Sequence, residues 1–328
     1  MSYEKTNENN VILDVQNLKK FFISNTNIFK RSQYIKAVND ISFQLEKGET
    51  YALVGESGCG KSTTGRTILQ LTEPTSGKAF YKNKNIFQFN HKELRNFRKK
   101  MQIVFQDPYS SLNSRKRIGS TLEEPLKIHK IGTKKERTKK VKNIMEKVGL
   151  QLDHYHRFSH EFSGGQRQRI GLARALIMNP EIIICDEPVS ALDVAIQSQI
   201  INLLQNLQKE MKLTYLFVSH DISVVRHMSD RIGVMYLGKI VEEGTTDDVI
   251  NDPLHPYTQS LLSAVPSYNS KKKKERIILK GEIPSPVNPP HGCVFHTRCP
   301  FAMDICKKEV PKATSMGNRK TVSCHLYN

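Results

Sequence analysis

The stretch Gly55-Glu56-Ser57-Gly58-Cys59-Gly60-Lys61-Ser62 decides how the rest of the chain is interpreted. It matches the pattern G-x-x-x-x-G-K-[ST], follows an expected strand over 50–54 and opens an expected helix over 61–71. Glycines let backbone N–H groups close around an anionic phosphate chain at a helix N-terminus, where the helix dipole also favours negative charge. The alternative, a glycine-rich turn with a chance lysine, is disfavoured by this context. The stretch therefore predicts a nucleotide-phosphate site, with Lys61 on the β- and γ-phosphates and Ser62 on Mg²⁺.

Composition sets wide limits on what the chain can be. Its 328 residues leave room for a sizeable α/β domain, and no stretch approaches the roughly 18 apolar residues of a spanning helix. The N-terminus, Met1 to Asn10, is polar, so we expect a protein in the cytosol or on the cytosolic side of a membrane. The net charge of +18 suits nucleic acid, nucleotide or anionic lipid. Without Trp or a stacking motif of the RNA-binding kind, this charge alone does not predict nucleic acid as a partner.

Short β-branched runs alternate with amphipathic helical patterns, which predicts a mainly parallel sheet with covering helices. The expected strands are 50–54, 101–105, 182–186, 214–219 and 231–236. A helix is expected over 195–211, with Asp193 near its start, and residues 106–180 form a helical insert. Past about Asn251 the composition shifts to Pro, Lys and Cys, including the run Lys271 to Lys274, so a boundary is expected there. No internal repeat is present, so the sequence contains the motifs of one nucleotide site.

A second expected apolar strand ends in two acidic residues. Ile182-Ile183-Ile184-Cys185 ends in Asp186 and Glu187, and the carboxyl ends of parallel strands form the ligand crevice of an open α/β sheet. Asp186 is placed to reach Mg²⁺ through its water shell, and Glu187 to act as general base on the attacking water. A solvated strand end is the alternative for the two acids, and Cys185 reads as a small core residue.

Further motifs resemble those of ATP-binding-cassette (ABC) proteins. Phe162-Ser163-Gly164-Gly165-Gln166, followed by Arg167-Gln168-Arg169, resembles the ABC signature, although alone it would be a Ser/Gly helix cap. Ser190-Ala191-Leu192-Asp193 resembles the D-loop, Gln106 the Q-loop glutamine, and Ser219-His220-Asp221 the switch histidine. Together with the two nucleotide motifs above, they follow the family's order over Val11 to about Ile250. The resemblance implies a P-loop NTPase (RecA-like) α/β fold: a polar tail at 1–10, an ABC nucleotide-binding domain at 11–250 with a helical insert at about 107–180, and a small extension at 251–328.

The resemblance also implies roles for individual residues. Residues 55–63, through Thr63, together with Asp186 would bind ATP and Mg²⁺, and Gln106 would ligate Mg²⁺ and report nucleotide state to a membrane partner. The residues Ser163, Gly164, Gly165, Gln166 and Asp193 would contact ATP bound by a second cassette, because the sites form at a head-to-tail dimer interface. Lys61, Gln106, Glu187 and His220 would be catalytic, so hydrolysis is expected. Phe22 matches best the aromatic that stacks on adenine, with Phe21 and Tyr34 as rivals near an apparent insertion at 23–35.

The C-terminal part resembles one branch of this family. Residues 254–262, starting Leu254-His255-Pro256-Tyr257, and residues 281–286 look like the extension of oligopeptide and dipeptide importers, in particular their F-type ATP-binding subunit. The branch also includes nickel and metallophore uptake systems, which stay as an alternative. The resemblance implies a peripheral protein at the cytoplasmic face of the cell membrane. Its partners would be a second ABC ATPase subunit, two transmembrane permease subunits and an extracytoplasmic substrate-binding protein.

Four cysteines crowd into the last part of the chain. Cys293, Cys299, Cys306 and Cys324 are spaced C-x5-C-x6-C-x17-C, unlike the paired C-x2-C of structural zinc sites. Thiolates suit zinc or an iron–sulfur cluster, and disulfides are not expected in a cytosolic chain. The resemblance implies a [4Fe–4S] cluster held by these four residues, with zinc or metal-free thiols as alternatives. His291, His296 and His325 lie among them and leave mixed ligation open.

Other functions fit the sequence less well. A soluble ABC ATPase that acts on nucleic acid is supported by the charge alone, and such proteins carry two cassettes or a long coiled coil. A regulatory ATPase with the cysteines as sensor is a third reading. Which peptide or metal complex is carried is not encoded in these motifs.

Overall fold

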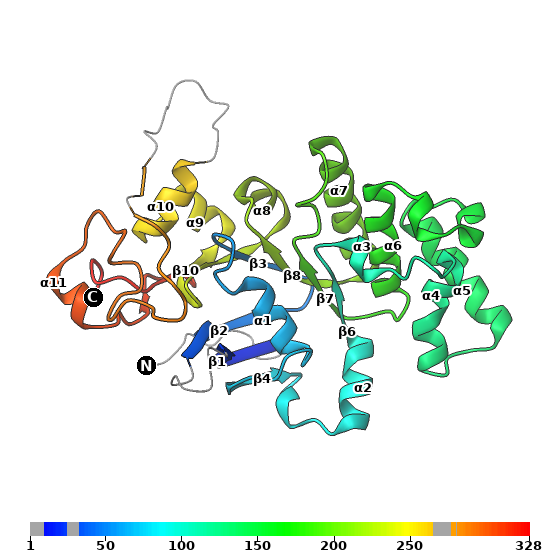
Figure 1. Cartoon of the computed structure of the whole chain (residues 1–328), viewed down its shortest axis with the longest axis horizontal. Coiled ribbons are helices and arrows are strands. Elements are labelled where there is room, and N and C mark those ends of the chain that lie inside the picture. Colours follow the sequence, from blue (N-terminus) through cyan, green and yellow to red (C-terminus); the bar gives the residue numbers. More distant parts are fainter. Residues whose placement is uncertain (1–9, 25–32, 265–276, 280) are drawn as a thin grey trace. The chain divides into compact units, whose positions relative to one another are not determined.

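The computed structural model describes residues 10–24, 33–264, 277–279 and 281–328 (Figure 1). The chain divides into two compact units, residues 1–88 with 219–328 and residues 89–218. Three features of the sequence lie largely or wholly outside the described residues: the polar tail, the middle of the apparent insertion at 25–32, and the run Lys271 to Lys274. Among the described residues, no helix has the length and apolar character needed to cross a bilayer.

The first unit contains an antiparallel sheet with the order β2-β1-β4-β5. Its strands are β1 (Val11–Ser24), β2 (Gln33–Glu46), β4 (Ser76–Tyr81) and β5 (Lys84–Asn85), followed by the 3₁₀ turn η1 (Ile86–Gln88). The pairing of β1 with β2 continues to Ser24 opposite Gln33, so both ends of the apparent insertion belong to a long hairpin. Alternate residues of β2 are buried, including Ile41, Phe43 and Leu45, as expected for a sheet with one face on a core.

The first unit also carries strands in the order β11-β12-β10-β9-β3. They are β3 (Thr50–Val54), β9 (Arg231–Tyr236), β10 (Lys239–Thr245), β11 (Thr314–Ser315) and β12 (Thr321–Val322). β3 runs parallel to β9, and both strands have the bounds that the sequence predicts. β12 pairs with β10, Glu242 opposite Val322, so the chain's last strand belongs to the same sheet as β3.

Short helices of the first unit follow its strands. They are α1 (Lys61–Ile68), α8 (Ile222–Met228), α9 (Thr246–Asn251), α10 (Pro256–Ser263) and α11 (Asp304–Lys308). α1 ends before the predicted Leu71, because Gln70 adopts a left-handed φ of 50° that a helix cannot continue through.

The second unit is built on parallel strands in the order β8-β7-β6. These are β6 (Met101–Val104), β7 (Ile182–Asp186) and β8 (Thr214–Ser219, whose last residue passes into the first unit). Every residue of β7 is buried, which explains its unbroken apolar sequence before Asp186. β7 and β8 have the predicted bounds, whereas β6 stops one residue short of the predicted Phe105.

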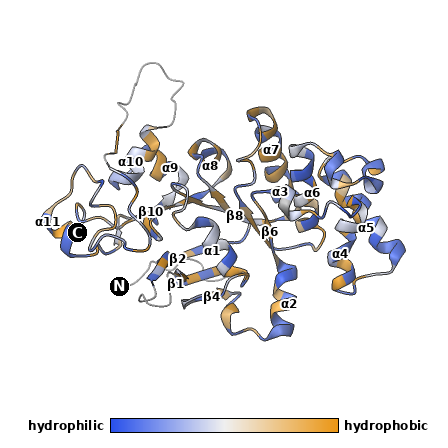
Figure 2. Ribbon diagram, in the orientation of Figure 1, coloured by the Kyte–Doolittle hydropathy of each residue, from blue (hydrophilic) through white to orange (hydrophobic). Residues whose placement is uncertain are grey.

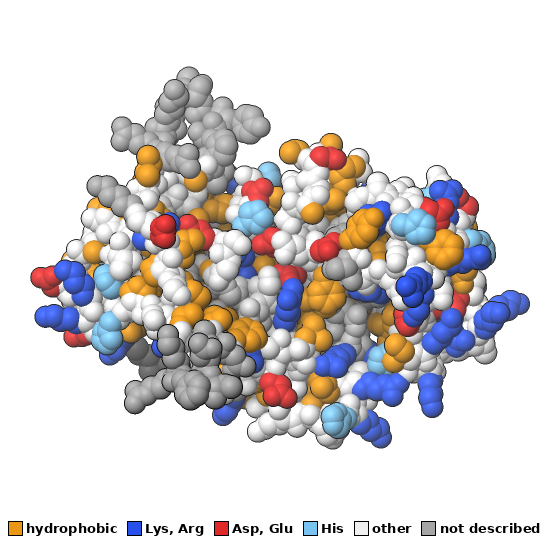
Figure 3. Space-filling view, viewed as in Figure 1, with side chains coloured by type: hydrophobic (Ala, Val, Ile, Leu, Met, Phe, Trp, Pro, Cys, Tyr) orange, Lys and Arg blue, Asp and Glu red, His pale blue; other side chains and the backbone are white. Residues whose placement is uncertain are grey.

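Helices make up most of the second unit. They are α2 (His91–Lys100), α3 (Pro108–Ser111), α4 (Ile118–Ile128), α5 (Lys134–Lys147), α6 (Gly164–Leu176) and α7 (Val194–Met211), with 3₁₀ turns η2 (Leu152–His156) and η3 (Ser159–Glu161). α7 starts one residue before the prediction and buries Ile200, Leu204 and Leu207. α5 is mostly hydrophilic (Figure 2), and Lys and Arg side chains gather over the helical part of this unit in Figure 3. The predicted insert at 107–180 contains α3 to α6, and the compact unit around it is wider.

Candidate functional site

The phosphate loop connects β3 to α1 in a conformation that requires glycine. Gly55 and Gly60 have φ of 152° and 109°. A Cβ atom at Gly55 would lie 2.1 Å from the carbonyl oxygen of Met235, and one at Gly60 would lie 2.0 Å from that of Ala37. Any side chain at these two positions would therefore displace the loop.

Lys61 is held inside the loop that precedes it. Its side chain is buried, and Nζ donates to the carbonyl oxygens of Gly55 at 2.7 Å and Glu56 at 3.0 Å. Backbone carbonyls orient the ammonium without neutralising its charge, so the charge stays available to an anion. Cys59 is buried beside it, and burial raises the pKa of its thiol, which keeps the thiol neutral and indicates a packing role for that side chain.

Glu56 connects the phosphate loop to the C-terminal part of the first unit. Its carboxylate accepts from both Nη atoms of Arg298 at 2.8 and 3.2 Å, and its N–H donates to the hydroxyl of Tyr257 at 2.9 Å. Arg298 and Tyr257 had no predicted role in the nucleotide site. The proximity of Arg298 to the cysteines was visible in the sequence, but nothing there linked it to residue 56.

His220 lies just after β8 in the first unit, and it is exposed. The turn around it is fixed by its neighbours, since Ser219 Oγ accepts from the N–H of Asp221 at 3.0 Å and Asp221 caps α8 through the N–H of Ser223 at 2.8 Å. Because it is exposed, the side chain of His220 is accessible to a ligand.

In the second unit, neighbouring parallel strands bring Gln106 and Glu187 together. Gln106 follows β6, Glu187 follows β7, and Gln106 Nε2 donates to Glu187 Oε2 at 2.8 Å. Asp186, one residue earlier, is buried. Glu187 has a φ of 47°, uncommon outside glycine, and its N–H donates to the carbonyl of Val218 at 3.0 Å. Strained backbone supported by a neighbouring strand is a feature of functional sites.

The predicted signature residues form the N-terminus of α6. Ser163 is the N-cap: its Oγ accepts from the N–H of Gln166 at 3.4 Å, and Gln166 Oε1 accepts from the N–H of Ser163 at 3.0 Å. Ser163 and Gly164 are exposed, whereas Gly165 is buried against Ile196, where a Cβ would lie 2.5 Å from Cγ2. Asp193 caps α7 through the N–H of Ile196 at 2.9 Å. Within one chain, capping explains Ser163 and Asp193, and the exposed helix end offers donors to a partner.

The candidate adenine-stacking residues lie on the β1–β2 hairpin. Phe22 pairs with Ile35 and Tyr34 with Ile23, so Phe22 and Tyr34 point to opposite faces of the hairpin. Phe22 is 37% exposed, and the ammonium of Lys20 lies 4.8 Å from the centre of its ring. Phe21, which pairs with Lys36, also remains a candidate, and a single adenine cannot contact both Phe22 and Tyr34.

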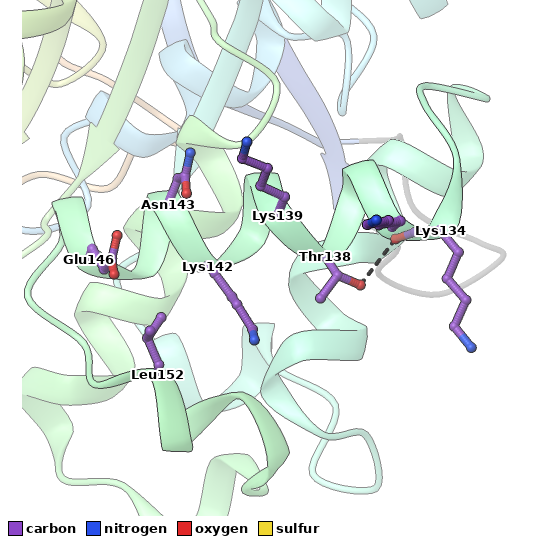
Figure 4. Close-up of a pocket in the computed structure, with 8 residues that line it drawn as sticks. Lys134, Thr138, Lys139, Lys142, Asn143, Glu146 and Leu152 are labelled. Carbon is purple, nitrogen blue, oxygen red and sulfur yellow. Dashed lines mark hydrogen bonds between the residues drawn. The ribbon is translucent and has the colours of Figure 1, made fainter.

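The predicted residues thus divide between the two units. The phosphate loop, Phe22 and His220 lie in the first, and Gln106, Asp186, Glu187, Ser163 and Asp193 lie in the second. A pocket of about 640 Å³ on α5 is separate from all of them (Figure 4). Its walls are lysine stems with Thr138, Asn143, Glu146 and Leu152, which describes a solvated basic helix face.

The four cysteines of the predicted iron–sulfur site do not form a ligand group for a single metal ion among the described residues. Cys293, Cys306 and Cys324 are buried and Cys299 is partly so, and all are free thiols. Burial, together with the neighbouring thiols, raises the pKa of Cys293 to about 11, so it is protonated at neutral pH. Within residues 10–24, 33–264, 277–279 and 281–328, no three His, Cys, Asp or Glu side chains are grouped so that they could hold a metal ion.

Known protein families and individual proteins match this sequence over most of its length. A family profile described as "ABC transporter" matches residues 38–190, and one described as "Oligopeptide/dipeptide transporter, C-terminal region" matches residues 241–306. The chain is 54% identical to the oligopeptide transport ATP-binding protein AppF of Bacillus subtilis, over 97% of this chain and 98% of that protein. It is 46% identical to the dipeptide transport ATP-binding protein DppF of Escherichia coli, over 99% and 97%.

Solved structures from the ABC family are similar to most of this chain. The cbiO1 component of a Clostridium perfringens ABC transporter complex matches with a TM-score of 0.64 and 29% identity, over 74% of this chain and 92% of that one. A dimeric ATP-binding cassette bound to ADP and phosphate matches with a TM-score of 0.63 and 30% identity, over 71% and 98%.

Proposed function

Because the chain belongs to the ATP-binding subunits of the ABC transporters for oligopeptides and dipeptides, we propose that it hydrolyses ATP to power peptide uptake across the bacterial cytoplasmic membrane. The observation that carries the proposal is the hydrogen bond from Gln106 to Glu187 at the end of the buried strand β7. It orients a carboxylate next to Asp186, as general-base attack of water on a γ-phosphate requires.

Each side chain has a task in this reaction. Lys61 and the backbone N–H groups of residues 55–63 hold the phosphates, and His220 contacts the γ-phosphate. Ser62, Gln106 and Asp186 offer a hydroxyl, an amide oxygen and a carboxylate, the hard oxygen donors that Mg²⁺ prefers. Mg²⁺ would neutralise charge on the phosphates. Glu187 takes the proton of the attacking water, and the Gln106 amide holds it in place.

A second cassette completes the site in this proposal. Ser163, Gly164, Gly165 and Gln166 would contact ATP held by the partner, with Asp193 beside them. The cap formed by Ser163 Oγ is 3.4 Å long and therefore weak, so turning the hydroxyl toward a phosphate costs little. Pairing of two cassettes is supported by the solved dimeric ATP-binding cassette bound to ADP and phosphate.

Peptide substrates follow from the relatives, which are oligopeptide and dipeptide transport proteins. The remaining partners would be two permease subunits and an extracytoplasmic binding protein, with this chain peripheral on the cytoplasmic face. A nickel or metallophore importer is the alternative within the branch. Substrate-stimulated ATPase activity of the reconstituted complex, with dipeptides against nickel chelates, distinguishes them.

The test of the hydrolytic role is Glu187→Gln. The amide keeps the hydrogen-bonding geometry but cannot accept the proton, so we expect ATP binding to be retained and turnover to fall by at least about 100-fold. The measurement is ATP affinity and phosphate release by the complex reconstituted with its partners. Near-normal release would remove Glu187 from this role.

We also propose that the four clustered cysteines hold a [4Fe–4S] cluster with a structural role. Support comes from the C-x5-C-x6-C-x17-C spacing, which differs from the paired C-x2-C of structural zinc sites. In addition, a four-iron cluster binds each thiolate to a different iron, so its ligands lie farther apart than those of one zinc ion. Anaerobically purified protein should contain about four iron atoms and four sulfides per chain. Zinc in their place, or no metal, would contradict the proposal.

A further inference from the structure

The phosphate loop contains a carboxylate, and its ionic partner comes from the far end of the chain. Arg298 and Glu56 form a two-fold hydrogen-bonded ion pair at 2.8 and 3.2 Å between residues 242 positions apart. The side chains are 9% and 27% exposed respectively, so water screens the pair only in part. Paired, partly buried guanidinium–carboxylate contacts of this geometry are strong and directional.

An anionic side chain is an unexpected component of an anion-binding loop. Without a partner, the Glu56 carboxylate would repel a phosphate chain bound by the adjacent N–H groups. Arg298 neutralises this charge and leaves Lys61 as the net charge of the loop. The ion pair thus affects the potential at the phosphate site through space, without Arg298 touching the nucleotide.

Glu56 is tied to three partners through three different groups. Its carboxylate binds Arg298, its N–H donates to the hydroxyl of Tyr257, and its carbonyl accepts from Lys61 Nζ at 3.0 Å. A shift of Arg298 or Tyr257 would therefore move the carbonyl that orients Lys61.

An aromatic cluster holds both C-terminal partners in position. Tyr257 is fully buried, with its ring 4.7 Å from that of Tyr236 and 5.4 Å from that of Phe295. The Arg298 guanidinium lies 5.9 Å from the centre of the Tyr236 ring, and the Arg298 N–H donates to the carbonyl of Phe295 at 3.0 Å. These contacts attach the C-terminal extension to the phosphate loop.

We propose that Arg298 is a positioning residue for nucleotide binding, through which the C-terminal extension neutralises Glu56 and holds the phosphate loop in its binding conformation. The inference rests on the proposed function, in which residues 55–63 bind ATP. It assigns the extension a direct part in the nucleotide site of its own chain.

The experiment is Mg·ADP binding by the purified full-length chain, measured by titration calorimetry. Arg298→Gln should weaken binding about tenfold at low salt, and the loss should shrink as added salt screens the exposed carboxylate. The matched control is Arg319→Gln, which removes another ion pair from the same extension, Arg319 to Glu46 at 2.7 Å, away from the phosphate loop. It should bind as the wild type does.

A second variant separates charge from folding. Adding Glu56→Gln to Arg298→Gln removes the unpaired carboxylate and should restore most of the lost affinity. Thermal melts check that each variant is folded, and Arg298→Lys, which keeps the charge, replaces Arg298→Gln if the latter does not fold and should lose less than tenfold. Wild-type affinity in Arg298→Gln, or no recovery in the double variant, would overturn the inference. Absence of Mg·ADP binding by the wild type would instead refute the proposed function.

Discussion

The glycine-rich helix N-termini at α1 in the first unit and at α6 in the second present their backbone N–H groups in different ways. Both present backbone N–H groups at a helix N-terminus, where anions bind favourably. At α1 the loop folds back on itself: Gly60 has a φ of 109° and Lys61 is buried against the loop's own carbonyls. At α6 the end is a standard capping box formed by Ser163 and Gln166, and Ser163 is exposed.

The comparison shows which of the two helix ends has its conformation set by contacts within its own chain. The loop at α1 is shaped by contacts within the first unit. The end of α6 needs no special backbone. Its capping box occupies the N–H groups of Ser163 and Gln166, and the exposed Ser163 and Gly164 are available to another molecule. We infer that changes at α1 act on the fold and on binding, whereas changes at α6 act on assembly and turnover.

The largest expected effect is that of Gly60→Ala. The methyl group would lie 2.0 Å from the carbonyl of Ala37, and alanine disfavours the required φ. We expect a loss of about 2–4 kcal/mol in the free energy of unfolding and at least a hundredfold weaker Mg·ADP binding. Urea denaturation and calorimetry measure the two.

Gly164→Ala is the matched control at the other helix end. A Cβ there meets Leu192 at 3.4 Å, an ordinary contact, and Gly164 does not have a positive φ. The free energy of unfolding should change by less than about 0.5 kcal/mol. If both variants lose stability equally, the contrast between the two ends is wrong.

A smaller effect concerns the strand that leads into the phosphate loop. Glu49 precedes β3 and lies 3.6 Å from Arg231, and burial raises its pKa to about 7. The folded state therefore binds a proton more tightly than the unfolded state, so stability falls as pH rises from about 4.5 to 7. Glu49→Gln should remove this fall. The difference in the free energy of unfolding between the variant and the wild type should therefore be about 1–2 kcal/mol more in favour of the variant at pH 8 than at pH 5.

Urea midpoints at the two pH values measure the effect of Glu49→Gln. A parallel pH dependence in the variant and the wild type would show that Glu49 does not titrate in this window. Glu243 and the carbonyl of Gln44, which also bind the Arg231 guanidinium, should keep it in place in the variant.

Local patterns were sufficient to predict much of the fold. β3, β7, β8 and β9 have the predicted bounds, because each is an apolar run between clear turn or polar residues. Errors lie at element ends: α1 stops at Ile68 because of the left-handed Gln70, and the apparent insertion at 23–35 includes the ends of β1 and β2. These depend on backbone conformation and strand pairing, which periodicity does not encode.

The sequence by itself determined the order of the nucleotide motifs, the family, and the residue types that can hold phosphate and activate water. These are signals carried by neighbours in the chain, where spacing and side-chain chemistry suffice. Only the tertiary structure decided that Gln106 holds Glu187, that Arg298 and Tyr257 reach Glu56, and that the thiols form no recognisable single-ion site among the described residues. Contacts between residues 81 to 242 positions apart depend on how strands pair and aromatic rings pack, which no local pattern specifies.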